Sequence, residues 1–507
     1  MTHSNTRREF LVRTSMLAGG ATTSLALQHP VARAATRQDE LTELSAVAAV
    51  TAMRNGDIKS EDYAGALVDR AQSLESLNAF ITLDREAVLE AARNADSKRA
   101  GGGATGALHG LPIPVKDSVN TRELRTTNGT GALRNFRPSE DAKVLDPLFS
   151  QGGILMGKTN IHELSYGWTS NNGIFGPAHN PYDRARVPGG SSGGSGVTVA
   201  ARMAPIAIAE DTLGSIRVPA TMCGLAGLRP SYGRYSGDGV MPLTMNKFDQ
   251  IGPLARSVKD LALFDSVVTG DGSPLEETPL KDVRIGISPE YFLSGLDPEV
   301  ERITNEAFLK LRAAGATLVW AEIPEAAKAA MGTAITIITY ETVPAISGFL
   351  EEQGTGLTFD QMLAQGSHGI QETMKAFALP PNRPSREAYE SMLAKRQEIR
   401  EEIRLYFQRQ GISALAFPPI MIPPPRIGEE TEATISGERV PLYIAMARNV
   451  ALGSCANMAS LILPAGITSS GLPVGLEFDA LNGNDRALLS LGLSLEKALG
   501  PIPAPQV

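Results

Sequence analysis

The sequence contains little of what metal, disulfide or imidazole chemistry requires. Among 507 residues there are two cysteines, Cys223 and Cys455, and six histidines. Two cysteines cannot form a disulfide framework or a cysteine-rich metal site. They could form one disulfide with each other or remain two buried thiols, and the sequence does not decide between these alternatives. The histidines are scattered, and His162-Glu163 is not part of an HExxH zinc motif. A metal hydrolase is therefore not expected.

Aromatic residues and positive charge are also scarce. Aromatic side chains make up 5% of the chain, and 47 basic residues stand against 55 acidic ones, which gives a net charge of −8. No basic run follows the first 40 residues, which argues against nucleic acid and acidic membranes as partners. Beyond the N-terminal region no segment is expected to be long and apolar enough to span a membrane. Glycine is abundant at 50 residues, so many tight loops are expected.

The N-terminus has the pattern of an export signal. Arg7 and Arg8 precede a modest apolar stretch, and Ala-Arg-Ala at 32–34 provides a small-x-small cleavage site. We expect a twin-arginine signal peptide over residues 1–34 and a mature protein over 35–507 that is periplasmic or secreted. The alternative is a basic N-terminal tail without structure.

Strand and helix patterns alternate along the rest of the chain. This alternation predicts an α/β fold in which one large domain has a central mixed sheet covered by helices on both faces. Asp297-Pro298 is expected to begin a helix, Ser385 and Gly411 to bound a helix over 386–410, and Ser60 to cap another. Strands are expected at 79–83, 111–115, 154–157, 204–210 and 282–288.

Two familiar motifs are misleading here. Residues 152–159 match the Walker A pattern, but their Ile-Leu-Met is itself the expected strand, and no acidic magnesium ligand is evident. Residues 189–193 match the G-x-S-x-G nucleophile elbow, yet the preceding NPYDRARVP cannot be the buried strand that this elbow needs. A histidine-dependent serine hydrolase stays an alternative, although no histidine has a suggestive setting.

Lys116, Ser191 and Ser215 form a coherent site if the fold brings them together. Ser215 lies in EDTLGSIRVPA, and the nearest histidines along the chain are His179 and His368. A buried lysine can act as a base when burial lowers its pKa by about three units from roughly 10.4. Such an amine could relay a proton from Ser215 through Ser191 and replace the missing imidazole. Taken singly, the three residues have ordinary explanations: a surface lysine, a polar linker and a helix cap.

Several long motifs, in their order, resemble the amidase signature family. They are LHGLPIPVKDSVNT, GKTNIHELSYGWTSNNGIFGPAHNPYD, PGGSSGGSG, EDTLGSIRVPATMCGLAGLRPSYGRYS and DQIGPLARSVKDLALF. The match is dense over about 105–265, the expected catalytic core, and looser from 40 to 500. The resemblance implies a C–N amide hydrolase without metal or cofactor, in which Lys116 is the base, Ser191 the relay serine on a cis peptide, and Ser215 the acylated nucleophile.

The resemblance also implies roles for the residues around this triad. Backbone N–H groups just before and at Ser215 would form the oxyanion hole, and residues from about 281 to 440 would cover the pocket. The implied oxyanion residues are Thr212, Leu213 and Gly214; the supporting residues are Ser192, Asp211 and Arg217; and the substrate-facing residues are Ser165, Tyr166 and Trp168.

Leu213 departs from the family pattern. Many members read Gly-Thr-Asp-Thr-Gly-Gly-Ser where this chain reads Ala-Glu-Asp-Thr-Leu-Gly-Ser over 209–215. If this position needs a positive φ, a leucine is strained by about 1–2 kcal/mol. Either φ is ordinary there or the loop has a different shape. Leu213 could also narrow the acyl pocket.

The substrate is expected to be a small amide that carries an aryl group. Within the family, RPSYGRYSGDGVMPLT and DQIGPLARSVKD are most similar to enzymes acting on indoleacetamide and mandelamide, and Tyr166 and Trp168 suit an aryl ring by stacking. Aryl carbamates, anilides and esters are the alternatives, and a non-catalytic exported binding protein is a further one. Export and the lack of a basic run argue against the amidase subunit of a tRNA-dependent amidotransferase. A homodimer is left open.

Overall fold

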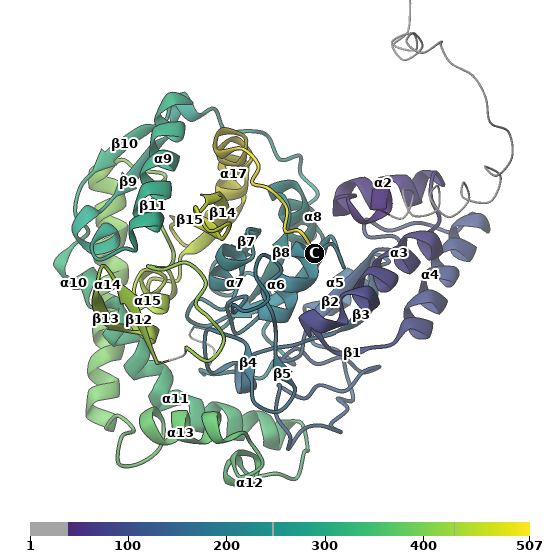
Figure 1. Ribbon diagram of the computed structural model, residues 1–507, viewed down its shortest axis with the longest axis horizontal. Coiled ribbons are helices and arrows are strands. Elements are labelled where there is room, and N and C mark those ends of the chain that lie inside the picture. Colours follow the sequence, from purple (N-terminus) through teal and green to yellow (C-terminus); the bar gives the residue numbers. More distant parts are fainter. Residues whose placement is uncertain (1–38, 246–247, 430) are drawn as a thin grey trace, which may run out of the picture. The chain divides into compact units, whose positions relative to one another are not determined.

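A mixed 11-stranded sheet runs through the computed structural model, which describes residues 39–245, 248–429 and 431–507 (Figure 1). The expected signal peptide lies outside the described residues, and residues 41–507 form one compact unit. In spatial order the strands are β1 (Phe80–Leu83), β3 (Ile154–Thr159), β2 (Pro112–Lys116), β6 (Ile206–Asp211), β8 (Gln250–Ala255), β7 (Ala226–Arg229), β14 (Ala459–Ile467), β15 (Pro473–Ala480), β11 (Ala414–Phe417), β9 (Arg284–Ile287) and β10 (Thr317–Trp320).

Helices make up the largest part of the regular structure outside this sheet. Two short two-stranded ribbons accompany them, β4 (Asn171–Asn172) with β5 (Gly176–Pro177) and β12 (Glu432–Ile435) with β13 (Glu438–Pro441). The helices are α2 (Ala46–Asn55), α3 (Ser60–Ser73), α4 (Arg85–Ala100), α5 (Leu145–Ser150), α6 (Gly193–Ala200), α7 (Arg217–Met222), α8 (Val258–Thr269), α9 (Pro298–Ala313), α10 (Glu325–Lys328), α11 (Ala330–Glu352), α12 (Phe359–Leu363), α13 (His368–Phe377), α14 (Arg386–Gln410), α15 (Leu442–Ala447), α16 (Ala451–Cys455) and α17 (Asp485–Leu499).

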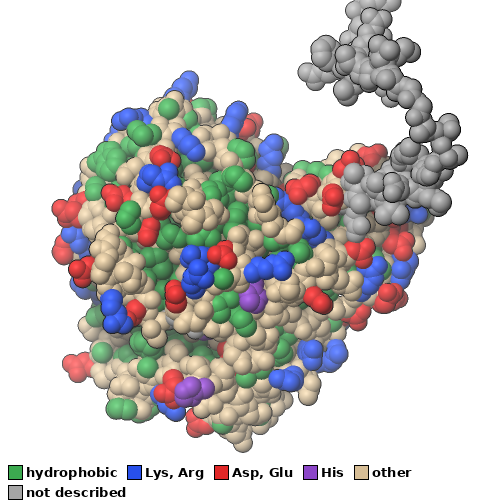
Figure 2. All heavy atoms as spheres, viewed as in Figure 1, with side chains coloured by type: hydrophobic (Ala, Val, Ile, Leu, Met, Phe, Trp, Pro, Cys, Tyr) green, Lys and Arg blue, Asp and Glu red, His purple; other side chains and the backbone are tan. Residues whose placement is uncertain are grey.

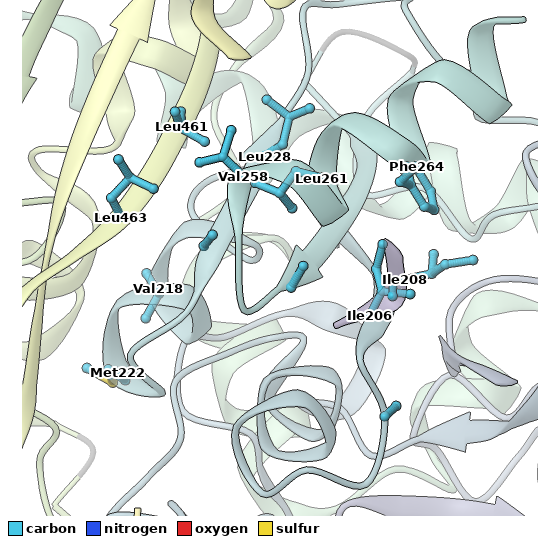
Figure 3. Packing of buried hydrophobic residues seen from close by; sticks show 14 of the residues in the cluster. Ile206, Ile208, Val218, Met222, Leu228, Val258, Leu261, Phe264, Leu461 and Leu463 are labelled. Carbon is cyan, nitrogen blue, oxygen red and sulfur yellow. The ribbon is translucent and has the colours of Figure 1, made fainter. Parts of the chain in front are cut away.

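Alternate residues of the central strands enter two different cores, because successive side chains of a strand point to opposite faces. On β6, Ile206 and Ile208 join the cluster that includes Leu261 of α8 (Figure 3). Ala207 and Ala209 of the same strand pack instead with residues of α6 and α7. Helices therefore cover both faces of the sheet, and the predicted α/β architecture is confirmed.

Parallel pairing of β2 and β6 sets the position of the site. Val115 of β2 lies opposite Ile208 of β6, so the two strands run side by side in the same direction. Their carboxyl ends therefore meet at one edge of the sheet. The last residue of β2 is Lys116, and β6 ends at Asp211, four residues before Ser215.

The helix caps agree with the local sequence signals except at Ser60. The Asp297 side chain accepts a hydrogen bond from the Glu299 N–H at the start of α9, and α14 lies between Ser385 and a left-handed Gly411. Ser60, by contrast, is the first residue of α3 and not its cap. Its buried hydroxyl donates to the Gly110 carbonyl at 2.8 Å, because a tertiary contact replaces the local one.

Helix α11 was not expected from the sequence. The prediction that no segment has the length and apolar composition of a membrane span is wrong for α11, which meets both criteria with a mean hydropathy of 1.2. In the structure 61% of that stretch is buried, against α14, α16 and α12 among others. A helix of the protein core can therefore have the same length and apolar composition as a membrane span, and α11 is such a helix in this structure.

The structure shows the state of the two cysteines and the distribution of surface charge. Cys223 and Cys455 are both buried free thiols, so the open question of a disulfide is settled in favour of two thiols. Figure 2 shows acidic and basic side chains interspersed over the visible face, without a broad area of one sign.

Candidate active site

Lys116 is completely buried at the carboxyl end of β2. Its Nζ lies 2.7 Å from Ser191 Oγ, which joins two of the three residues predicted to meet. Burial lowers the pKa of Lys116 below its ordinary value, against the opposing effect of the Glu210 carboxylate. The amine is therefore in an environment that makes it easier to deprotonate than a surface lysine.

Ser191 is held by the start of α6 and by the backbone around it. The Gly190–Ser191 peptide is cis, and the Ser191 carbonyl accepts hydrogen bonds from the His162 N–H at 3.0 Å and the Ser170 hydroxyl at 3.1 Å. The glycines nearby permit this close packing: a Cβ on Gly194 would lie 2.5 Å from backbone atoms of neighbouring segments. Ser192 Oγ donates to the Glu210 carbonyl at 3.1 Å and so ties this loop to β6.

Ser215 lies in a loop organised by a single carboxylate. Asp211 accepts hydrogen bonds from the Gly214 N–H at 2.9 Å and the Ile216 N–H at 3.0 Å, on either side of Ser215. The Ser215 hydroxyl has no hydrogen-bond partner within the described residues, so the contact from Ser191 to Ser215 is not made in this structure. Lys116 and Ser191 are brought together directly, while Ser215 follows β6 at the same edge of the sheet.

Gly214, and not Leu213, has the unusual backbone conformation of this loop. The φ of Gly214 is 106°, whereas Leu213 is not among the non-glycine residues with positive φ. The ordinary φ of Leu213 removes the backbone strain that its side chain would otherwise bring. Of the expected oxyanion donors, Gly214 N–H is already bonded to Asp211, and the N–H groups of Thr212, Leu213 and Ser215 make no such bond.

A buried ionic network lies behind the nucleophile loop. Arg217 contacts Asp211 through Nε and Nη2, at 3.0 Å each, and also contacts Glu477 Oε1 at 2.9 Å. Arg229 Nε approaches the same Asp211 at 3.2 Å. Although burial alone would raise the pKa of Asp211, the two guanidinium groups and hydrogen bonds outweigh it and hold that pKa well below its ordinary value. Asp211 is thus a fixed anion that anchors the loop.

Glu210 is the main feature of the site that the sequence did not reveal. Its carboxylate lies 2.8 Å from Lys116 Nζ, with the two side chains 1% and 0% exposed. A glutamate in an apolar strand implies a buried partner, but the local sequence does not say which residue that partner is. The available signal was that Glu210 stands where many members of the resembled family have threonine.

No histidine takes part in this constellation within the described residues. His162 is the histidine near Lys116, and its ring Nδ1 contacts Thr169 Oγ1 at 3.2 Å, not a serine of the site. Burial, with a contribution from Lys116, lowers the pKa of His162 to about 4. The geometry therefore does not favour the histidine-dependent alternative.

Ser215 opens onto a largely apolar pocket. The predicted substrate-facing residues Ser165, Tyr166 and Trp168 line it, and Trp168 Nε1 also donates to the Leu213 carbonyl at 2.7 Å. Further lining residues come from the region expected to cover the pocket and from α15. The large apolar ones among them are Ile335 and Ile338 of α11, Phe377 of α13 and Tyr443 of α15.

Comparisons with known proteins agree with this geometry. The family model described as Amidase matches residues 63–489. Mandelamide hydrolase from Pseudomonas putida is 32% identical over an alignment of 484 residues that covers 92% of this chain and 94% of that protein. Indoleacetamide hydrolase from Agrobacterium vitis is 32% identical over 449 residues, covering 88% and 95% of the two chains. A crystal structure of an amidase has a TM-score of 0.81 at 29% identity and covers 90% of this chain and 100% of its own. The chain therefore belongs to the amidase family and is an amide-bond hydrolase.

Proposed function

We propose that the enzyme cleaves the C–N bond of small, aryl-containing carboxamides through an acyl-enzyme on Ser215. The observation that carries this proposal is the 2.7 Å contact between the buried Lys116 amine and Ser191, beside a nucleophile that opens onto an apolar cavity. A serine nucleophile whose hydroxyl contacts no histidine among the described residues needs another base, and a desolvated lysine meets that need.

The acylation step follows from these positions. Neutral Lys116 takes the hydroxyl proton of Ser191, and Ser191 takes that of Ser215, whose oxygen attacks the amide carbon. Ser215 turns toward Ser191 when substrate binds, since catalytic hydrogen bonds are often loose in an empty site. Collapse of the tetrahedral intermediate breaks the C–N bond, and the proton returns through Ser191 to the leaving nitrogen. Water then repeats the sequence on the ester and releases the acid.

The oxyanion forms at the loop that precedes Ser215. The N–H groups of Thr212, Leu213 and Ser215 are the candidates to donate hydrogen bonds to it, because the Gly214 N–H already donates to Asp211. Trp168, bonded to the Leu213 carbonyl, fixes the orientation of the Leu213–Gly214 peptide. Preorganised backbone donors of this kind each contribute about 10²- to 10³-fold to kcat.

The acyl group is expected to be aromatic. The cavity wall is mainly apolar, and it includes Tyr166 and Trp168 together with aliphatic and aromatic residues of α11 and α13. Two relatives are named for mandelamide and indoleacetamide, both amides of aryl-bearing acids. An aryl carbamate is the second candidate, because its cleavage passes through the same tetrahedral oxyanion.

The test is hydrolysis by residues 35–507 of a panel of arylacetamides, anilides, aliphatic amides and aryl carbamates. Arylacetamides should be turned over best, Ser215→Ala should abolish turnover, and Lys116→Ala should lower kcat/KM by about 10³-fold or more at neutral pH. Full activity of Lys116→Ala would refute the lysine relay. Preference for carbamates would select the second candidate.

We also propose that a twin-arginine signal exports the enzyme to the periplasm or beyond. The support is Arg7-Arg8 before an apolar stretch and the small-x-small site at 32–34. In a bacterial host with twin-arginine transport, the processed chain should begin at residue 35 and fractionate with the periplasm or medium. Replacing both arginines by lysine should leave the unprocessed chain in the cytoplasm; unchanged processing would contradict the proposal.

A further inference from the structure

The amine of Lys116 has three oxygen partners, and Glu210 supplies two of them. Nζ lies 2.8 Å from Glu210 Oε2, 3.3 Å from the Glu210 carbonyl oxygen and 2.7 Å from Ser191 Oγ. The carboxylate itself receives hydroxyl groups from Ser118 and Ser165 on Oε2 and from Thr212 on Oε1. All of these side chains are buried.

The number of protons on the amine decides what these contacts can do. A neutral amine has two N–H groups and one lone pair, and an ionised carboxylate or a carbonyl can only accept. When the two N–H groups point to the two Glu210 oxygens, the lone pair is left for Ser191. A hydroxyl is the one partner of the three that can donate to it. By occupying both N–H groups, Glu210 therefore directs the basic lone pair of Lys116 at the relay serine, Ser191.

We propose that Glu210 is a positioning residue that extends the Ser-Ser-Lys relay to four members, by directing the Lys116 lone pair to Ser191 and stabilising the ammonium formed there. This inference rests on the proposed function of Lys116. In acylation, one proton moves from Ser215 to Ser191 and one from Ser191 to Lys116, while the carbonyl oxygen of the substrate takes the negative charge. The new positive charge then lies 2.8 Å from the Glu210 carboxylate. Return of the proton to the leaving nitrogen restores the starting charges.

Other charged groups face the same amine, and the test must separate them from Glu210. Asp211 and Asp249 act on Lys116 at longer range, and His162 lies near it and is neutral at physiological pH. Burial and the nearby Glu210 raise the pKa of Asp249 to about 7. Thr212 lies between the two acids and contacts both. A protonated Asp249 can donate to Thr212, which then donates to Glu210, so that the chain of hydrogen bonds is complete.

The decisive variant is Glu210→Gln, which keeps the size and an acceptor oxygen but removes the charge. The carboxylate favours the protonated amine, so its removal lets Lys116 lose its proton at lower pH. The acid limb of the pH profile of kcat/KM should move down by about one to three pH units. At the same time the high-pH plateau of kcat should fall on the order of 10²-fold, because the ammonium formed in the transition state is no longer stabilised. A purely structural role would lower the rate without moving the limb.

Asp117→Asn is the matched control. Asp117 and Lys158 form another buried lysine–carboxylate pair, 3.7 Å apart, whose amine does not contact Ser191. In that variant the acid limb should stay where it is in the parent enzyme. An unmoved limb in Glu210→Gln, an equal movement in both variants, or an unchanged plateau in Glu210→Gln would each overturn the proposal.

Labelling of Ser215 by an aryl sulfonyl fluoride gives a second readout that needs no turnover. Its rate constant against pH should show the same downward movement in Glu210→Gln, and Glu210→Asp, which keeps the charge, should retain a limb close to that of the parent. If Glu210→Gln does not fold, Glu210→Asp alone decides. Because this variant keeps the charge, an acid limb one to three pH units below that of the parent would overturn the proposal. Lys116→Ala is measured alongside. Rapid labelling of that variant would refute the lysine relay itself, whereas slow labelling with an unmoved Glu210→Gln limb refutes the role of Glu210 alone.

Discussion

Replacing Arg217 by methionine tests how the nucleophile loop is held in place. Arg217 is fully buried and donates to Asp211, Glu477, the Val450 carbonyl and the Ser454 hydroxyl. Methionine keeps most of the stem but removes every donor. Asp211 still has Arg229 and its backbone donors after this change. The main loss is the ion pairing of Arg217 with Asp211 and Glu477, and both carboxylates stay buried. Breaking such a pair costs about 3–5 kcal/mol.

This cost converts into a modest but measurable fall in melting temperature. At about 2.1 cal/mol/K of unfolding entropy per residue, a domain of this length changes its midpoint by about 1 °C for each kcal/mol. Calorimetry of residues 35–507 at neutral pH should therefore show a fall of about 3–5 °C. The difference should narrow as the pH falls below about 4, because the depressed pKa of Asp211 contributes stability above its unfolded pKa and loses it on acidification.

Arg302→Met provides the control for this measurement. Arg302 bridges Glu299 and Glu306 along α9, but it lies at the surface, where ion pairs contribute little. Its midpoint should stay within about 1 °C of the parent. An Arg217→Met protein that melts as close to the parent as Arg302→Met would refute the view that this network holds the loop.

Three further predictions concern catalysis. The kcat/KM for an arylacetamide should rise with pH until Lys116 loses its proton, below the ordinary lysine value, and a chelator should not change it; a rate that falls between about pH 6 and 9 would contradict the lysine base. Leu213→Ala removes three carbons from the cavity wall, at about 0.8 kcal/mol each, and should lower kcat/KM for aryl substrates by up to about 50-fold, with less effect on acetamide. Trp168→Phe keeps an aromatic ring but loses the bond to the Leu213 carbonyl, and should lower kcat by about tenfold or less with KM nearly unchanged; an effect on KM alone would assign Trp168 to substrate packing.

Local signals predicted the ends of some helices to the residue. Asp297-Pro298 and the Ser385 and Gly411 caps act within one turn, so the sequence around them is enough to specify α9 and α14. Helix α11 has no such signals: its start carries no side-chain cap, and Pro344 lies inside it. Buried residues surround much of this helix, so the polar stripe that reveals a surface helix is weak. Its existence depends on the helices that cover it.

The meeting of Lys116 with Ser191 could be expected from the resemblance, but not from spacing. The two residues are 75 positions apart, and β2 becomes the parallel neighbour of β6 only through the order of the whole sheet. Periodicity predicts that β2 and β6 are strands, not that they are neighbours. The same order brings the end of β2 to the residues before Ser215. A site built at the ends of parallel strands therefore needs topology that local pattern does not contain.

Glu210 shows the limit of reasoning by resemblance as well. A family pattern carries over only where residues match. The departure at Leu213 has no backbone consequence, because its φ is ordinary, whereas the departure at Glu210 supplies the partner of Lys116. A buried carboxylate is costly unless it is paired, so an acid inside an apolar strand already implies a buried partner. Lys116, expected to be a buried base, was the available cation at the end of the neighbouring strand. The contact between them follows from the two desolvation costs taken together, since each charge in such a site is tolerated only through the other.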